Sequence, residues 1–285
     1  MTDSLSRRSI LRGAAGAAIL AGAVGMTPAG AEPSTEDFRR RFRVPKEKIS
    51  IQLWTLRRIL ATDLEGTLEA LADIGYRKVE LAGLHGRTAA EFRAILDRVG
   101  IRATSTHVSI DGDIDQLIAD ARTLGHKYVV HPFAQFATIA EWQAFVERLE
   151  RAGAAFRRAG FQFGYHNHAH EFTPIDGVRP WDLITRGTTR KNVHLEVDLY
   201  WAVTGGADPI RLFWENFGRV KQYHVKDRAP DGSFADPGTG TIDFPRIFRA
   251  NHVQEVDEYI VENDEPADAL VTAEIGYEYL RNLRF

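Results

Sequence analysis

The feature that most constrains this chain is a regular alternation of short apolar runs with longer amphipathic stretches after residue 48. Eight runs have the length and composition of strands: 49–54, 78–81, 103–108, 127–131, 161–166, 193–198, 220–225 and 258–262. Eight stretches have the periodicity of helices: 63–74, 87–99, 112–124, 138–159, 179–186, 207–216, 243–250 and 264–281. Several predicted helices end at a glycine just before the next strand, as in the loops of α/β folds.

This alternation predicts an α/β fold, a single (β/α)8 TIM barrel over residues 49–285. A doubly wound open sheet is the alternative, and that fold usually carries a glycine-rich phosphate-binding turn after its first strand. Here the first strand is followed by TLRRILATD, which contains no such turn. We therefore expect the barrel.

The first 31 residues have the organisation of an export signal. Arg7 and Arg8 precede the apolar run AAGAAILAGAVG and then Ala29-Gly30-Ala31, which is typical of a twin-arginine signal peptide with its cleavage site. The apolar run is shorter than the roughly 20 residues that a membrane span needs. We expect removal after Ala31 and a periplasmic or otherwise exported protein, with a membrane anchor as the alternative. Residues 32–48 are predicted to be a linker.

Composition limits the partners. Without residues 1–31 the chain has 33 Lys and Arg against 38 Asp and Glu, a formal charge of −5. Such a chain has no bulk attraction for phosphate backbones, so no nucleic-acid partner is expected. It has no cysteine, so the exported fold must be held by its core, with or without a metal, and not by disulfides. We expect no stable membrane insertion after signal removal, and the sequence gives no prediction of oligomeric state.

Ionisable residues accumulate where a TIM barrel places its active site, at the carboxyl ends of the strands. The first strand ends in an aromatic residue, and the others end in a histidine or a carboxylate. In order these residues are Trp54, Glu80, His107, His131, His166 with His168, Asp198, His224 with Lys226, and Glu262. Buried polar groups are costly without partners, so this clustering indicates a functional site.

Strand alternation assigns some of these residues to the inward face. On the fifth strand Phe163 and Tyr165 share one face, and His166 shares the other with His168. A consistent choice of inward face brings together four residues from consecutive strands: His166, Asp198, His224 and Glu262. Two imidazoles and two carboxylates suit zinc, manganese, cobalt or iron(II). We expect one divalent metal ion there, and the alternative is four unrelated polar residues with separate partners.

Four motifs in this order, GYHNHAHEF, EVDLYW, QYHVKD and YIVENDEP, resemble the sugar phosphate isomerase/epimerase family of the xylose isomerase-like TIM-barrel superfamily. The opening IQLWTLR and the turn PGTGTIDF match the same group, and the resemblance covers residues 49–281. The superfamily also contains the second family of AP endonucleases, ketose 3-epimerases, and inosose isomerases and dehydratases. The resemblance implies one divalent metal ion held by Glu, Asp, His and Glu on strands five to eight.

Asp198, His224 and Glu262 match the last three ligands that the resemblance implies, but the first position departs from it. His166 stands where most relatives have a glutamate. Glu171, five residues further on, is the alternative ligand, and we prefer His166 because it lies at the strand end. An imidazole in place of a carboxylate makes the site less anionic and favours zinc or another ion that tolerates nitrogen ligands.

The resemblance implies proton abstraction next to a carbonyl that the metal ion polarises. This chain keeps only Glu262 of the two glutamates that the ketose epimerases use, so a symmetrical two-glutamate shuttle is not expected. The candidate bases are Glu262, His168 and Glu171. Lys226 is expected to stabilise an enolate oxygen, unless Asp198 or Asp227 pairs with it.

The candidate substrate-binding residues are Trp54, Glu80, His107 and His131, although Trp54 is also the kind of residue that simply packs a barrel mouth. We expect a sugar isomerase or epimerase acting on a small, non-phosphorylated sugar or sugar derivative. The alternative is a metal-dependent lyase or hydratase acting on 3-keto-glycosides or keto-polyols by β-elimination. A minor alternative is a non-catalytic sugar-binding protein. An AP endonuclease-like phosphodiesterase fits poorly with the acidic charge and the export signal.

Overall fold

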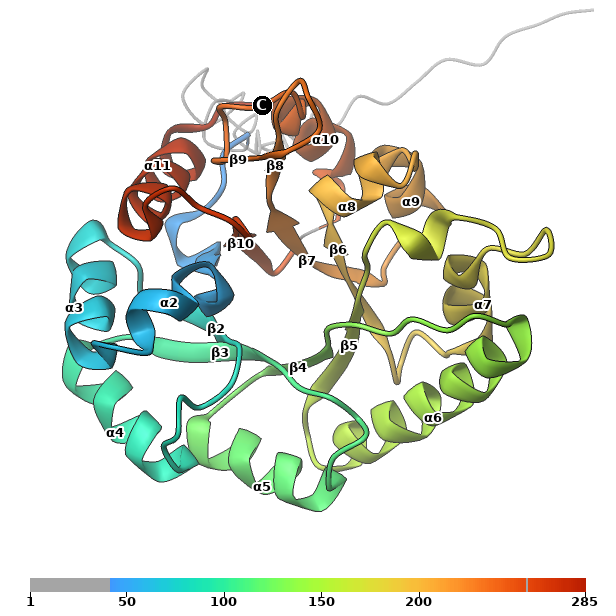
Figure 1. The fold of residues 1–285 in the computed structure, drawn as a ribbon, viewed down its shortest axis with the longest axis horizontal. Helices are drawn as coiled ribbons and strands as arrows, with labels where there is room; N and C mark the ends of the chain where they lie inside the picture. Colours follow the sequence, from blue (N-terminus) through green and yellow to red (C-terminus); the bar gives the residue numbers. More distant parts are fainter. Residues whose placement is uncertain (1–41, 255) are drawn as a thin grey trace, which may run out of the picture.

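The computed structural model describes residues 42–254 and 256–285, so the predicted signal and most of the predicted linker lie outside the described residues. Eight parallel strands form one sheet in the order β1-β10-β7-β6-β5-β4-β3-β2. They are β1 (Ile49–Ile51), β2 (Lys78–Leu81), β3 (Arg102–His107), β4 (Tyr128–His131), β5 (Gln162–His166), β6 (His194–Asp198), β7 (Val220–Val225) and β10 (Glu258–Val261). A parallel bridge from Gln52 to Glu80 joins the two sheet edges. The predicted barrel is confirmed (Figure 1).

Eight helices surround the barrel and correspond to the predicted ones (Figure 1). They are α3 (Leu64–Ile74), α4 (Ala89–Val99), α5 (Ile114–Leu124), α6 (Ile139–Arg158), α7 (Pro180–Gly187), α9 (Pro209–Glu215), α10 (Phe244–Asn251) and α11 (Ala269–Asn282). Thr88 and Thr138 begin α4 and α6 with capping boxes. None of the helices in the described part of the chain combines the length and the apolar character that a bilayer crossing needs.

Short elements that the sequence pattern did not predict lie before β1 and after several strands. They are η1 (Lys46–Lys48), η2 (Leu53–Leu56), α2 (Arg57–Leu60), η3 (His170–Phe172), α8 (Leu199–Thr204) and the hairpin β8 (Asp227–Arg228) with β9 (Phe234–Ala235). Strand β1 therefore ends three residues earlier than predicted, because Gln52 caps η2 by accepting a hydrogen bond from the backbone N–H of Trp54. Val44, from the end of the predicted linker, is buried in the core of the barrel.

The faces of strand β5 follow the predicted alternation. Phe163 and Tyr165 point outward, where Phe163 stacks on Phe156 of α6 and Tyr165 contacts Phe145 of the same helix. His166 is buried on the other face, inside the barrel. On this strand the apolar side chains thus pack between sheet and helices, and the histidine faces the interior of the barrel.

One carboxylate fixes the loop that follows β7. Asp227 is fully buried and accepts backbone hydrogen bonds from Arg228, Gly238, Gly240 and Ile242 at 2.8–3.1 Å. A Cβ at Gly240 would collide with the Asp227 carboxylate, and Gly238 has a positive φ of 86°. The glycines of the PGTGTIDF turn are therefore required by the approach of the backbone to this carboxylate.

Replacing Asp227 by asparagine is expected to loosen this loop, because an amide nitrogen cannot accept the hydrogen bonds that one carboxylate oxygen accepts. We expect Asp227→Asn to lower the free energy of unfolding by roughly 2 kcal/mol and to speed tryptic cleavage after Arg228. Asp231→Asn is the matched control, because Asp231 is exposed in the same loop. Urea unfolding in which the two variants are equally stable would contradict this account.

His131, at the end of β4, is a buried neutral histidine. It is 3% exposed, and its Nδ1 accepts a hydrogen bond from the backbone N–H of Ile110. Its ring lies 5.2 Å from that of Phe145 and 6.1 Å from that of Tyr165. Burial lowers the pKa of His131 to about 4, against about 6.5 for an unfolded histidine.

This lowered pKa predicts a pH dependence of stability. Above about pH 6.5 His131 is neutral in both the folded and the unfolded protein, so protonation of this residue does not lower stability. Below about pH 6.5 the unfolded protein binds the proton first, and stability falls until the folded protein also binds it near pH 4. At pH 5 the loss is about 2 kcal/mol. His131→Asn keeps an acceptor but does not titrate. Between about pH 7.5 and pH 5 the free energy of unfolding should fall by about 2 kcal/mol less in this variant than in the unchanged protein. If the free energy of unfolding falls equally in both proteins, His131 is not responsible.

Candidate metal centre

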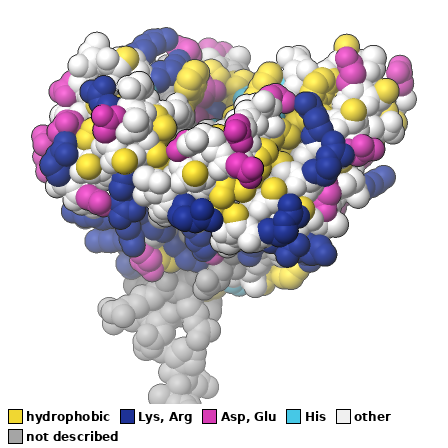
Figure 2. All heavy atoms as spheres, turned by 90° about the horizontal axis from the view of Figure 1, so that it is seen from below, with side chains coloured by type: hydrophobic (Ala, Val, Ile, Leu, Met, Phe, Trp, Pro, Cys, Tyr) yellow, Lys and Arg dark blue, Asp and Glu magenta, His cyan; other side chains and the backbone are white. Residues whose placement is uncertain are grey.

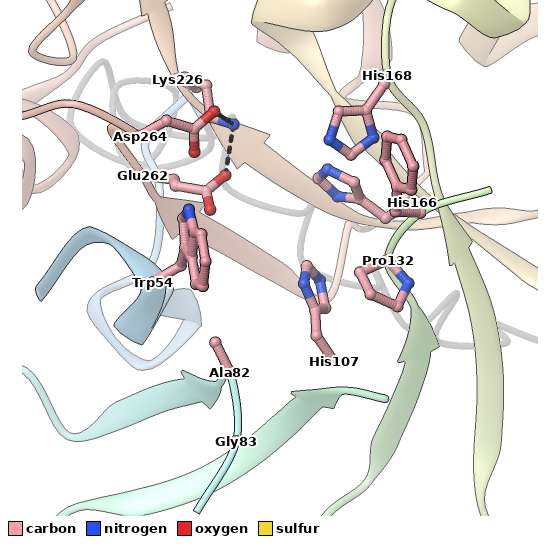
Figure 3. A pocket seen from close by; sticks show the side chains of 11 residues that line it. Trp54, Ala82, Gly83, His107, Pro132, His166, His168, Lys226, Glu262 and Asp264 are labelled. Carbon is pink, nitrogen blue, oxygen red and sulfur yellow. Dashed lines mark hydrogen bonds and ion pairs between the residues drawn. The ribbon is translucent and has the colours of Figure 1, made fainter. Parts of the chain in front are cut away.

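A pocket of about 460 Å³ opens at the carboxyl ends of the barrel strands. The molecule is hollowed at its upper edge in Figure 2, and Figure 3 shows the pocket from close by. Its lining residues are Trp54, Ala82, Gly83, His107, Pro132, Phe133, His166, His168, Lys226, Glu262 and Asp264. Six of them, namely Trp54, His107, His166, His168, Lys226 and Glu262, are residues that the sequence placed at strand ends. The pocket thus lies at the carboxyl ends of the strands, where the sequence predicted the functional site.

Carboxylates gather around one ammonium group on one side of the pocket (Figure 3). The Nζ of Lys226 lies 2.7 Å from Glu262 Oε2, 3.0 Å from Asp198 Oδ2 and 3.0 Å from Asp264 Oδ2. Burial alone would lower the pKa of Lys226, but these three carboxylates outweigh burial and raise it above its ordinary value. Asp227, one of the expected partners of Lys226, is instead bound to backbone N–H groups.

Glu262 also remains ionised. Burial would raise the pKa of Glu262, but Lys226 and then His224 outweigh burial and hold it far below its usual range. The Nδ1 of His224 lies 2.7 Å from Glu262 Oε2. The carboxylate is therefore present in the charged form that a cation requires.

Imidazoles form the opposite side of the pocket, where His166 and His168 lie (Figure 3). The Nδ1 of His168 is buried and has no hydrogen-bond partner among the residues that the structure describes. Burial and, next, the charge of Lys226 lower the pKa of His168 to about 3. Rings of Phe133 and Trp201 lie 5.1 and 5.3 Å from its ring. His168 is thus a neutral imidazole whose ring lines the pocket and whose buried Nδ1 is unpaired among the described residues.

The structure brings three of the predicted metal ligands together and places the fourth, His166, beside one of them. One ligand atom each from Asp198, His224 and Glu262 lies within 4.8 Å of the others, and His166 Nε2 lies 3.8 Å from Asp198 Oδ2. Asp198 Oδ2 is buried and accepts no hydrogen bond from the described residues, although Lys226 is its ion-pair partner. A mixed set of nitrogen and oxygen donors, with a buried carboxylate oxygen that has an ion-pair partner but no hydrogen bond, fits a divalent transition-metal ion.

Sequence reasoning missed three residues at or below this pocket. Glu196 is fully buried and lies within 4.8 Å of His107, His166 and His224 through one ligand atom each. It stands two residues before Asp198 in EVD, so strand alternation was the signal that placed it on the inward face. Asp264 follows Glu262 by the same spacing. Phe133, two residues beyond β4, is 49% exposed at the pocket, and no strand pattern marks it.

Glu80 and His131, predicted to bind substrate, lie away from the pocket. The carboxylate of Glu80 is fully buried and accepts hydrogen bonds from Gln52 and Ser105, in contact with His107 and His224. His131 is packed between aromatic rings, as described above. Their polar atoms are engaged within the protein, so the structure corrects their assignment to substrate.

Glu171, the alternative ligand and candidate base, also lies away from the pocket. It is fully buried and accepts hydrogen bonds from the Tyr165 hydroxyl at 2.7 Å and from the backbone N–H of His168 at 2.9 Å. The structure therefore corrects its assignment to the chemistry, and Glu171 supports the loop that carries His168. Trp54, by contrast, is 46% exposed at the pocket, and the Arg57 guanidinium stacks on its ring. It presents a free aromatic surface rather than filling the barrel mouth.

Known proteins resemble this chain over most of its length. Residues 68–281 match the family model described as Xylose isomerase-like TIM barrel. An inosose dehydratase of Geobacillus kaustophilus is 25% identical over 266 residues, which cover 76% of this chain and 86% of the relative. The rhizopine catabolism protein MocC of Rhizobium meliloti is 25% identical over 273 residues, 78% of this chain and 82% of the relative.

Among solved structures, a sugar phosphate isomerase/epimerase from Parabacteroides distasonis has a TM-score of 0.73 and 25% identity, covering 84% of this chain and 94% of that one. A dehydratase and an isomerase/epimerase thus share this barrel. Because the family model spans most of the residues, the chain belongs to the xylose isomerase-like TIM barrel family.

Proposed function

We propose that the protein is a metal-dependent lyase that acts on a keto-polyol or keto-sugar by β-elimination. The observation that carries this proposal is the difference between the two sides of the pocket. One side offers the neutral imidazole of His168, and the other offers an ammonium group held by carboxylates. The inosose dehydratase relative, which matches over most of its length, supports the lyase more directly than the isomerase expected from the motifs.

One divalent ion would be held by His166, Asp198, His224 and Glu262. When bound, it would polarise the substrate carbonyl and make the neighbouring C–H acidic. With two imidazoles in the set, we propose zinc or another ion that accepts nitrogen ligands in preference to magnesium or calcium.

His168 is the proposed base. Its ring lines the pocket, and at neutral pH its lowered pKa keeps it unprotonated. Glu262, the other remaining candidate, already contacts His224 and Lys226 through its Oε2. We therefore assign Glu262 to ion binding and His168 to proton abstraction from the α carbon.

Lys226 is the proposed electrostatic partner of the reaction. Its ammonium group lies across the pocket from His168 (Figure 3). With Asp198 and Glu262 bound to the ion, its N–H groups would be free to donate hydrogen bonds to the substrate oxygens. As the C–H bond breaks, the electron pair forms the carbon–carbon double bond, and the β substituent leaves with its own bonding pair. A cation opposite the base stabilises the negative charge on the departing oxygen. The leaving group is then protonated to water or to an alcohol.

An isomerase or epimerase is the second candidate, because the Parabacteroides structure carries that name. Its first step would be the same proton abstraction. Epimerisation then requires a second proton carrier on the opposite face of the same carbon. In this pocket Glu262 and Asp264, which lie opposite His168, are both ion-paired with Lys226. This arrangement is better suited to assist a leaving group than to return a proton to the substrate.

The pocket favours an uncharged substrate. Lys226 is the only lysine or arginine among the lining residues, and three carboxylates neutralise it. A phosphate group would therefore meet an acidic surface without a free cation. The exposed ring of Trp54 offers a platform for the apolar face of a sugar ring. We propose a non-phosphorylated substrate, in agreement with the export route predicted from residues 1–31.

Metal content tests the first part of this proposal. We expect about one divalent transition-metal ion per purified chain by elemental analysis, and activity that is lost on chelation and restored by the ion. Asp198→Asn should lower the content strongly, whereas Asp264→Asn, which changes a pocket carboxylate outside the ligand set, should retain it. Less than about 0.2 equivalents in the unchanged protein would contradict the proposal.

Product analysis with an inosose and with a 3-keto-glycoside tests the reaction. We expect an unsaturated or dehydrated keto product, and we expect His168→Gln to lower kcat by about 10²- to 10⁴-fold with unchanged metal content. His170→Gln is the matched control, because the Nε2 of His170 lies 2.7 Å from the carbonyl oxygen of Ala134. Formation of a stereoisomer as the main product would instead support the epimerase.

A further inference from the structure

Two carboxylates lie inside the barrel, beneath the proposed ion site. Glu80 on β2 and Glu196 on β6 are both fully buried. Glu196 precedes Asp198 by two residues on the same strand face, which places it about 7 Å deeper along the strand. Neither residue lines the pocket, so neither is available to the substrate.

Glu196 contacts both proposed imidazole ligands, and Glu80 contacts one of them, His224, on the side away from the ion site. His166 directs its Nδ1 at Glu196 Oε1, at 3.1 Å, and its Nε2 toward Asp198. His224 directs its Nε2 at Glu80 Oε1, at 2.8 Å, and at Glu196 Oε1, at 3.0 Å, while its Nδ1 faces Glu262. Each ring thus has one nitrogen on a deep carboxylate and the other among the proposed ligands.

We propose that Glu80 and Glu196 are positioning residues that select the ligating nitrogens of His224 and His166. This inference rests on the metal site of the proposed function. A carboxylate that accepts a hydrogen bond from one imidazole nitrogen fixes the hydrogen there, and it leaves the lone pair of the other nitrogen free for an ion. Glu196 accordingly fixes Nε2 of His166 as the ligand atom, and Glu80 together with Glu196 fixes Nδ1 of His224.

The surroundings of the two carboxylates hold them in place for this role. Glu80 is fixed by hydrogen bonds from Gln52 and Ser105. His107 approaches Glu196 Oε1 at 2.7 Å and Glu80 Oε1 at 3.1 Å, and its ring stacks parallel to that of His224 at 5.4 Å. Glu196 also supplies a carboxylate oxygen next to His166, at a strand end where the ligand itself is a neutral imidazole.

The test measures ion binding rather than turnover. We expect Glu196→Gln to raise the dissociation constant for Zn²⁺, measured by chelator competition, by about 10- to 100-fold, and to alter the visible spectrum of the Co²⁺-loaded protein. Glu80→Gln is the second variant, because it reaches His224 independently of Glu196. Glu258→Gln is the matched control, since Glu258 is also buried inside the barrel but is bound by Lys78 and Gln222. It should leave both readouts unchanged.

The outcomes separate this inference from the proposed function. If the unchanged protein binds one Zn²⁺ and Glu196→Gln and Glu80→Gln bind it as tightly as Glu258→Gln, the positioning role is overturned and the metal site stands. Two ions per chain, reduced to one by Glu196→Gln, would show that Glu196 is itself a ligand, together with His107, His166 and His224, and would also overturn it. No ion in the unchanged protein would overturn both.

Discussion

The site depends on how the barrel accommodates buried negative charge. Glu80, Glu196, Asp198 and Glu262 all lie within the barrel or at its mouth, at most 4% exposed. A buried carboxylate is strongly destabilising unless a cation or several hydrogen-bond donors compensate it. Here the compensating groups are the protonated His107, His224 and Lys226, and a divalent ion bound at Asp198 and Glu262 would supply positive charge in their place. The arrangement that makes burial tolerable is thus the arrangement that suits a divalent ion.

Much of the fold could be predicted because the periodicity of a TIM barrel is local. The helix that ends at Ile74 and the strands that end at Leu81 and His166 occupy the segments that their apolar patterns indicated. The misplaced boundaries have local causes as well. Trp54 was assigned to the first strand, but the capping of η2 by Gln52 ends that strand earlier. Short rim elements such as η3 and α8 have too few residues for a period to be visible.

The site could be predicted in part for the same reason. Strand alternation places His166, Asp198, His224 and Glu262 on one face, and a barrel has only one interior. Strand alternation does not distinguish a polar side chain that points into the pocket from one that is hydrogen-bonded to residues deeper in the barrel. That difference depends on contacts between strands that are distant in the sequence. Glu171 was misassigned because its partner, the Tyr165 hydroxyl, lies on the outward face of β5. Glu196 was missed although its spacing from Asp198 was visible.

The central claim is that one divalent ion is held by His166, Asp198, His224 and Glu262, with Glu80 and Glu196 behind the two imidazoles. An anomalous-scattering map from crystals of the protein loaded with Zn²⁺ tests this most directly. The account predicts a single peak bonded to His166 Nε2, Asp198, His224 Nδ1 and Glu262, with Lys226 moved away from the centre of the carboxylates. A peak among His107, Glu196 and His224, or no peak inside the barrel, would contradict it.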